Sequence, residues 1–220
     1  MDTLEYKLTY RRHLPHIQPP GATLFVTFRL AGSIPEAVEQ ALRAEMEAVQ
    51  QQIDQIKDAG ERARVWYREQ KRMFGRWDDV LDAAASGPQW LLEPIIAQLV
   101  QNSFHHLNGK VYDLDTYCLM SNHAHLVFTP LLKDGGSYHA LPAIMQSLKG
   151  YTARKANEIL KRKGQFWQHE SYDHVVRDGA ELNRIRRYVL QNPVKAGLVA
   201  QGDVWQWSYC QLFNVLEETS

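Results

Sequence analysis

Apolar positions recur along the chain at two spacings, and together they predict a mixture of strands and helices. β-Branched and aromatic residues are concentrated in three runs that predict strands: Leu24–Leu30, Val111–Cys118 and His123–Thr129. Apolar residues recur at helical spacing from Leu91 to Phe104 and from Leu141 to Leu160. Each of these two segments is therefore expected to bury one face of a helix.

The C-terminal part predicts one more extended segment and one more helix. Tyr172–Val176 is expected to be extended, and Asp178 with Glu181 has the spacing of a capping box at a helix N-terminus. The helix that follows carries Tyr188. We expect it to stop at Asn192–Pro193, because the residue before a proline is driven out of the helical region.

The stretch at about residues 34–86 differs from the rest because its helix-forming positions are mostly polar and charged. We expect it to form a helical arm or insertion. Without it the predicted order is β-α-β-β-α-β-α, which favours an α+β fold, a ferredoxin-like antiparallel sheet with helices packed on one face. The 220 residues are expected to form a single catalytic domain, 1–220, that carries this arm.

Overall charge says little about partners, because 25 basic side chains balance 25 acidic ones. Local charge says more: from Met145 to Ala200, eleven Lys and Arg residues face five Asp and Glu residues. The excess of six positive charges suits an anionic partner, although a solvated helix face has the same composition.

Cysteine usage and hydropathy indicate the compartment. Cys118 and Cys210 are the only cysteines, and their spacing matches neither a disulfide framework nor a zinc motif. No apolar stretch reaches membrane-spanning length, and the N-terminal residues lack the apolar core of a signal peptide. We therefore expect a cytoplasmic protein with no membrane partner.

Two histidines lie two residues apart inside one predicted strand. Because side chains alternate across a strand, His123 and His125 point to one face while Ala124, Leu126 and Phe128 point to the other. Two imidazoles on one face of a rigid strand are a potential pair of metal ligands. A strand with two partly solvated histidines is the simpler alternative.

A tyrosine on the predicted C-terminal helix is a candidate nucleophile. Tyr188 lies one helical turn before Asn192, so the two side chains share a face. Arg184, Arg186 and Arg187 precede the phenol, and neighbouring positive charge favours the phenolate. The alternative is an amphipathic helix whose tyrosine packs on the sheet while its arginines face water.

Together these residues suggest phosphodiester chemistry. A divalent cation on His123 and His125 can polarise a phosphodiester, and Tyr188 can attack the phosphorus and form a phosphotyrosine. Two histidines leave the cation short of ligands, and we expect Asn192 to supply an oxygen, with Gln191 as a weaker candidate.

The chain resembles the HUH single-tyrosine transposases, in the branch called REP-associated tyrosine transposases. The resemblance is carried by Met120–Leu126, Ser147–Lys149, Asn157, Gly164–Gln168, Tyr172–His174 and Tyr188–Leu198, with Asp78, Leu81 and Gly87–Leu91 upstream. Relatives usually have proline where Ser121 stands and a larger residue where Ala124 stands, and neither departure removes a ligand. The resemblance implies His123 and His125 as metal ligands, Tyr188 as nucleophile and Asn192 as a third ligand.

The resemblance also implies an activity and a partner. It implies a Mg²⁺- or Mn²⁺-dependent endonuclease and strand transferase that acts on single-stranded, hairpin or palindromic DNA through a covalent 5′-phosphotyrosine. Monomer and homodimer both remain open.

Several residues fit contacts with such DNA. Phosphates are expected at Lys149, Arg154, Lys155, Arg184 and Arg187. Trp167 and Tyr172 are candidates for stacking on bases, and a place in the core is the alternative for Trp167.

Two other functional classes are open from the sequence. The first is a catalytically silent module of the same fold that binds DNA or RNA. The second is a metal hydrolase with a zinc-activated water, which predicts a further His, Asp or Glu ligand and no dependence on Tyr188. An amidohydrolase barrel would need more strands than this chain provides.

Overall fold

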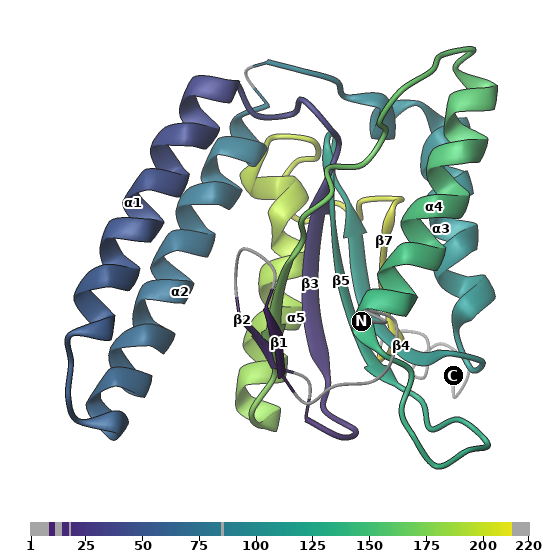
Figure 1. The fold of residues 1–220 in the computed structure, drawn as a ribbon. Helices are drawn as coiled ribbons and strands as arrows, with labels where there is room; N and C mark the ends of the chain where they lie inside the picture. The colour runs from purple at the N-terminus through teal and green to yellow at the C-terminus, as the bar shows by residue number, and fades with distance from the viewer. Residues whose placement is uncertain (1–8, 12–14, 18, 85, 213–220) are drawn as a thin grey trace.

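The computed structural model describes residues 9–11, 15–17, 19–84 and 86–212. Its centre is a five-stranded antiparallel sheet with the strand order β6-β3-β5-β4-β7 (Figure 1). The sheet contains β3 (Leu24–Arg29), β4 (Tyr112–Leu119), β5 (His123–Pro130), β6 (Tyr172–Val175) and β7 (Ser208–Cys210). The first four strands have the ferredoxin-like order, so the predicted α+β class is confirmed. The sequence did not predict β7, nor the separate pair β1 (Thr9–Arg11) and β2 (Pro15–Ile17).

One face of the sheet is covered by α3 (Pro94–Leu107) and α4 (Leu141–Ile159), with the short 3-10 helix η1 (Trp90–Leu92) before α3. The main core lies here. Alternate residues of β3 and β5 point into it, among them Leu24, Val26, Phe28, Leu126 and Phe128. These two helices lie where the periodicity of the sequence predicted them.

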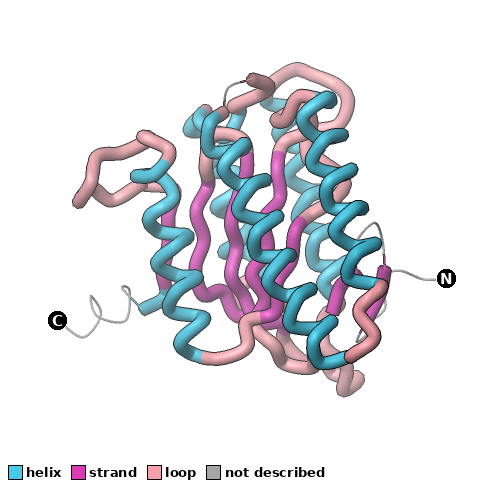
Figure 2. The backbone as a smooth tube through the Cα atoms, turned by 90° about the vertical axis from the view of Figure 1, so that its left-hand side faces the viewer, coloured by secondary structure: helices cyan, strands magenta, loops and turns pink. Residues whose placement is uncertain are grey.

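The opposite face is covered as well, by α5 (Gly179–Lys195) and α2 (Ala59–Ala83), so the helices do not all lie on one face as expected (Figures 1 and 2). The other alternate positions, Phe25 and Val127, pack there in a second cluster with Val189 and Phe74. All six residues of β3 are buried, so both faces of this strand must be covered by other elements. Helices on one face alone would leave the other face in solvent.

The predicted helical arm consists of α1 (Glu36–Asp54) and α2, which lie side by side in Figure 1. Asp58 begins the second helix, and its carboxylate accepts a hydrogen bond from the Glu61 N–H at 2.6 Å. The arm does not project freely, because Met73, Asp78 and Leu81 of α2 are buried. The division of the chain into one domain with an arm stays a prediction.

The helix α5 continues through Pro193 and ends at Lys195, whereas the sequence predicted a stop at Asn192–Pro193. Pro193 lacks the N–H that would bond to the Val189 carbonyl, and only two helical residues follow it before α5 ends. The extra residues keep Asn192 and Lys195 on one helix. Among the helices that the structure describes, none is long and apolar enough to cross a membrane.

Candidate active site

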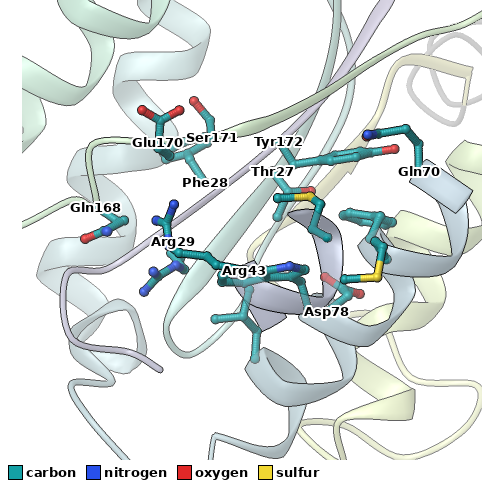
Figure 3. Close-up of a pocket in the computed structure, with 15 residues that line it drawn as sticks. Thr27, Phe28, Arg29, Arg43, Gln70, Asp78, Gln168, Glu170, Ser171 and Tyr172 are labelled. Carbon is teal, nitrogen blue, oxygen red and sulfur yellow. The ribbon is translucent and has the colours of Figure 1, made fainter. Parts of the chain in front are cut away.

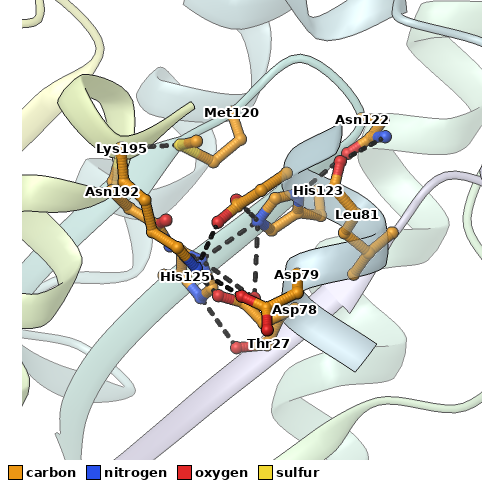
Figure 4. Close-up of polar contacts among 12 residues, drawn as sticks. Thr27, Asp78, Asp79, Leu81, Met120, Asn122, His123, His125, Asn192 and Lys195 are labelled. Carbon is orange, nitrogen blue, oxygen red and sulfur yellow. Dashed lines mark hydrogen bonds and ion pairs between the residues drawn. The ribbon is translucent and has the colours of Figure 1, made fainter. Parts of the chain in front are cut away.

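The strand β5 presents both histidines to the face covered by α2 and α5. His125 lies opposite Thr27 of β3 in the strand register, and both imidazoles are fully buried. Their Nε2 atoms lie 3.1 Å apart (Figure 4). The shared orientation predicted from strand alternation is therefore observed. Partly solvated histidines, the simpler alternative, are wrong.

The other nitrogen of each ring is held by a neighbour. The Nδ1 atom of His123 lies 2.7 Å from the side-chain oxygen of Asn122, and that of His125 lies 2.8 Å from the Thr27 hydroxyl. The Asn122 amide is itself fixed, because its nitrogen donates to the Leu81 carbonyl at 3.0 Å. An amide oxygen only accepts, so His123 carries its proton on Nδ1 and its Nε2 lone pair is available to a metal.

Burial also sets the charge of the pair. It lowers the pKa of His123 to about 3 and that of His125 well below its ordinary value, with the Lys195 ammonium acting in the same direction. Both rings are therefore neutral at neutral pH, the form that a metal ligand requires.

A third group reaches the pair from α2. The Oδ1 atom of Asp78 lies 3.7 Å from His123 Nε2 and 3.5 Å from His125 Nε2. Among the described residues this buried oxygen has no hydrogen-bond partner. Burial, and secondarily the carboxylate of Asp82, raise the pKa of Asp78 to about 7. A cation between these atoms would remove the repulsion between the two Nε2 lone pairs, and it would give the Asp78 Oδ1 atom a partner.

These three atoms fit one divalent cation. All their separations are shorter than twice the usual ligand distance of about 2.1 Å, so one ion can contact all three. Two imidazoles and a carboxylate suit a transition-metal ion better than Mg²⁺, which prefers oxygen ligands.

Asn192 lies beside the same nitrogens. When its amide is oriented so that the nitrogen donates to the two Asp82 oxygens, at 3.2 and 3.0 Å, its oxygen lies 2.6 Å from His125 Nε2. The Lys195 Nζ atom also binds Asp82, 2.9 Å from its Oδ2 atom. The Asn192 oxygen is thus available as a further ligand.

Tyr188 contacts the cluster of His123, His125 and Asp78 through its hydrogen bond to Asp78. Its hydroxyl donates to the Oδ2 atom of Asp78, and its ring centroid lies 5.8 Å from that of His125. Phe25 and Phe74 pack edge-on against the phenol and fix its direction. The candidate nucleophile and the histidine pair therefore share one carboxylate.

The arginines before Tyr188 do not surround its hydroxyl, which corrects the expectation of a cationic environment. Arg186 binds Asp115 of β4 at 2.8 Å, while Arg184 and Arg187 are exposed. The charged group at the phenol is the carboxylate of Asp78, because helix α2 docks beside α5.

The candidate DNA-binding residues fall on two sides of the sheet. Arg184 and Arg187 belong to α5, on the histidine face, whereas Lys149, Arg154 and Lys155 belong to α4, on the opposite face. Of this second set, Lys149 donates to the His169 carbonyl at 2.9 Å and Lys155 pairs with Glu158 at 2.8 Å.

Trp167 lies in the main core, which does not fit the expected stacking on a base. Its side chain is 4% exposed, and its indole N–H donates to the Thr152 hydroxyl at 2.8 Å. It also packs against Phe28 with ring centroids 4.8 Å apart. The core alternative is the one observed.

Sequence reasoning did not assign Asp78, Asp82 or Lys195 to the site. The available signal was the spacing of Asp78 and Asp82, one turn apart on a helix and therefore on one face. Nothing local links them to histidines on a distant strand.

Comparison with known proteins gives a family match and a similar structure. Residues 91–192 match the family model described as "Transposase IS200 like". No curated protein matches the chain. Among solved structures, the chain is similar to one titled "Structure of the REP associates tyrosine transposase bound to a REP hairpin", at 15% identity and a TM-score of 0.53, over 96% of this chain and 87% of that one.

The matched segment contains His123, His125, Tyr188 and Asn192. The structural likeness shows a shared fold over nearly the whole chain. The resemblance to the single-tyrosine transposases is thereby confirmed by the match of residues 91–192 to the IS200-like transposase model, and the structural likeness adds the shared fold.

Proposed function

We propose that this protein is a metal-dependent endonuclease and strand transferase of the REP-associated tyrosine transposase branch. It nicks single-stranded DNA beside a hairpin, holds the cut strand as a 5′-phosphotyrosine and passes it to a 3′-hydroxyl. The observation that carries the proposal is the convergence at Asp78, whose Oδ1 faces both histidines and whose Oδ2 accepts from the Tyr188 hydroxyl.

Tyr188 acts as the nucleophile in this proposal. Its oxygen forms a bond to the phosphorus, and the bond between phosphorus and the 3′-oxygen breaks. The phenolic proton passes along the existing hydrogen bond to Asp78 Oδ2, and the departing 3′-oxygen takes a proton from solvent. The bond energy is conserved in the phosphotyrosine, so attack by another 3′-hydroxyl rejoins the strand.

The cation is assigned to His123, His125 and Asp78, with the Asn192 oxygen as a fourth ligand. When bound, it supplies Lewis-acid polarisation of the phosphate and neutralises developing negative charge. The donor set favours Mn²⁺ over Mg²⁺, because two of its members are imidazoles. Thr27 and Asn122 hold the imidazoles in the required orientation.

Hairpin DNA is the proposed substrate, since the structurally similar transposase is bound to a REP hairpin. Arg184 and Arg187 are exposed on the helix that carries Tyr188, so we assign them to phosphates near the nick. Lys149, Arg154 and Lys155 lie on the far face and suit a more distant part of the same DNA.

A covalent trapping experiment tests the proposal. The protein is incubated with Mn²⁺ and a pool of labelled hairpin oligonucleotides with randomised unpaired flanks, then separated under denaturing conditions. We expect a covalent adduct that maps to the Tyr188 peptide and disappears in Tyr188→Phe while DNA binding persists. Tyr151→Phe is the matched control, because Tyr151 is an exposed tyrosine on the opposite face.

Each alternative class gives a different result in this experiment. A silent binding module retains the hairpin but forms no adduct and no nick. A hydrolase with an activated water nicks equally well in Tyr188→Phe. The double variant His123→Ala and His125→Ala should lose all cleavage, and retained cleavage would contradict the metal assignment.

A further inference from the structure

A pocket opens beside the candidate active site, between the α1–α2 helical pair and strands β3 and β6 (Figure 3). The helices contribute Arg43, Gln70, Phe74 and Trp77, and the chain before and within β6 contributes Gln168 and Tyr172. Tyr172 is a base-stacking candidate named from the sequence, whereas Arg43, Gln70 and Trp77 have no part in the proposed chemistry.

Aromatic rings and an arginine line the pocket. Phe74 and Tyr172 stack with ring centroids 4.2 Å apart, and the Arg29 guanidinium lies 5.7 Å from the centre of the Trp77 ring. Trp77 and Tyr172 are only partly buried, so the pocket keeps ring surface that the core does not cover. Aromatic faces and a guanidinium plane are the surfaces on which unpaired bases stack.

Polar groups stand at its margins. Gln70 and Gln168 both line the pocket, on opposite sides of the view in Figure 3. Each amide offers a donor and an acceptor, which is what the edge of a base requires. Gln168 is oriented by a 3.4 Å contact with Glu39, which also binds Arg43 at 2.7 Å.

The pocket and the metal cluster are continuous. Thr27, which holds the His125 ring, and Asp78, which faces both histidines, line the pocket as well. A nucleotide whose phosphate lies at the cluster can therefore place its base between the helical pair and the sheet. This distinguishes the pocket from an isolated surface hollow.

We propose that this pocket binds one unpaired nucleobase of the DNA strand, that of a nucleotide adjoining the phosphate attacked by Tyr188. Trp77 and Tyr172 supply the stacking surface, and Gln70 and Gln168 select among bases through their edges. The inference rests on the proposed nuclease function and adds a base preference to it. It also gives the helical pair a role in choosing the cleavage site.

The test couples a protein variant to a DNA variant and measures binding rather than cleavage. The nick made by the unmodified protein is first mapped on the randomised hairpin pool. Each unpaired nucleotide around the mapped nick is then replaced in turn by an abasic nucleotide. Affinities are measured by fluorescence anisotropy with Mn²⁺, in the Tyr188→Phe background so that the DNA stays intact.

One abasic position next to the nick should weaken binding by about tenfold, in keeping with the loss of one stacked base. The same replacement should have almost no further effect in Trp77→Ala, because the stacking partner is already absent. Trp77→Phe, which keeps a ring, should restore most of the coupling. Gln70→Ala should reduce base preference at this position alone, whereas Gln51→Ala, an exposed glutamine of α1 outside the pocket, should leave it unchanged.

The outcomes separate this inference from the function on which it rests. If the protein nicks the pool but every abasic effect persists unchanged in Trp77→Ala and Gln70→Ala, the pocket is not a base site and the nuclease proposal stands. If no member of the pool is bound or nicked by the unmodified protein, the proposed function fails and the inference fails with it.

Discussion

The two faces of the central sheet differ in the kind of side chain that they bury. Beneath α3 and α4 the buried groups are almost all apolar, with Phe104, Ile144 and Leu148 at most 1% exposed. Beneath α2 and α5 the sheet buries His123 and His125 together with the carboxylate of Asp78. Burying ionisable groups costs folding free energy, so the first face supplies stability and the second is arranged to bind charge.

The largest expected effect comes from Asp78→Asn on the polar face. Cleavage should fall by about a thousandfold, or about 4 kcal/mol, because one ligand and the proton acceptor of Tyr188 are lost together. The metal-free protein should at the same time unfold at higher denaturant, since a buried carboxylate becomes neutral.

The neighbouring Asp79→Asn is the control for this change, because Asp79 is largely exposed and pairs only with Lys195 in the described contacts. Cleavage assays and urea unfolding measure the two effects. A loss of less than about threefold in Asp78→Asn would remove this residue from the site.

The next effect belongs to the apolar face. Leu148→Ala should lower the free energy of unfolding by about 2–5 kcal/mol, because it leaves a cavity in the main core. Cleavage per folded molecule should not change. Ile159→Ala, at a 38% exposed position on the same helix, should cost well under half as much. Comparable losses in both variants would mean that this face is not the stability core.

A smaller, pH-dependent effect is expected at Glu181, which fastens α2 to α5. Its buried carboxylate binds Lys71 at 2.8 Å and also accepts from Tyr67 and Arg177. Although burial acts in the opposite direction, these donors together hold the pKa of Glu181 far below its ordinary value. The stabilisation is therefore complete above about pH 4.3, the pKa of an unfolded Glu, and is lost as the pH falls toward the folded value.

Glu181→Gln should accordingly lower stability at pH 7 by about 1–2 kcal/mol and reduce the further loss between pH 7 and pH 3. Urea unfolding at the two pH values measures both quantities. If the unmodified protein and the variant lose equal stability on acidification, Glu181 does not titrate as described.

The smallest effect should come from the helix caps. Asp178 accepts from the Glu181 N–H at 2.7 Å, so Asp178→Ala should cost about 1 kcal/mol in thermal or urea unfolding. Asp203→Ala, at an exposed position outside the helices, should cost almost nothing. Equal stabilities for the two variants would show that the cap contributes little to α5.

The parts of the site set by local geometry could be predicted from the sequence. Strand alternation placed His123 beside His125, and helical spacing placed Tyr188 near Asn192. The helix N-cap at Asp178 and four of the five strands of the sheet followed from similarly short patterns. In each case the relation spans only a few residues.

The rest depends on how distant elements pack. Asp78 reaches the histidines only because α2 docks on α5, through contacts such as the ion pair of Lys71 with Glu181. No pattern within a few residues predicts such a contact. Both α2 and α5 were predicted as helices, but their place on the second face of the sheet was not, because the apolar residues on both faces of a strand do not identify the elements that cover them. The sequence left two roles for Trp167, stacking on a base or a place in the core, and only the packing in the structure assigns it to the core.

The central claim is that one divalent cation joins His123, His125 and Asp78 beside the Tyr188 hydroxyl. Anomalous diffraction from a crystal soaked in Mn²⁺ tests it most directly. We predict a peak about 2.1 Å from both Nε2 atoms and from Asp78 Oδ1, with the Tyr188 hydroxyl in the adjoining shell. An anomalous map with no peak at these atoms under saturating Mn²⁺, or a peak bound elsewhere, would contradict the account.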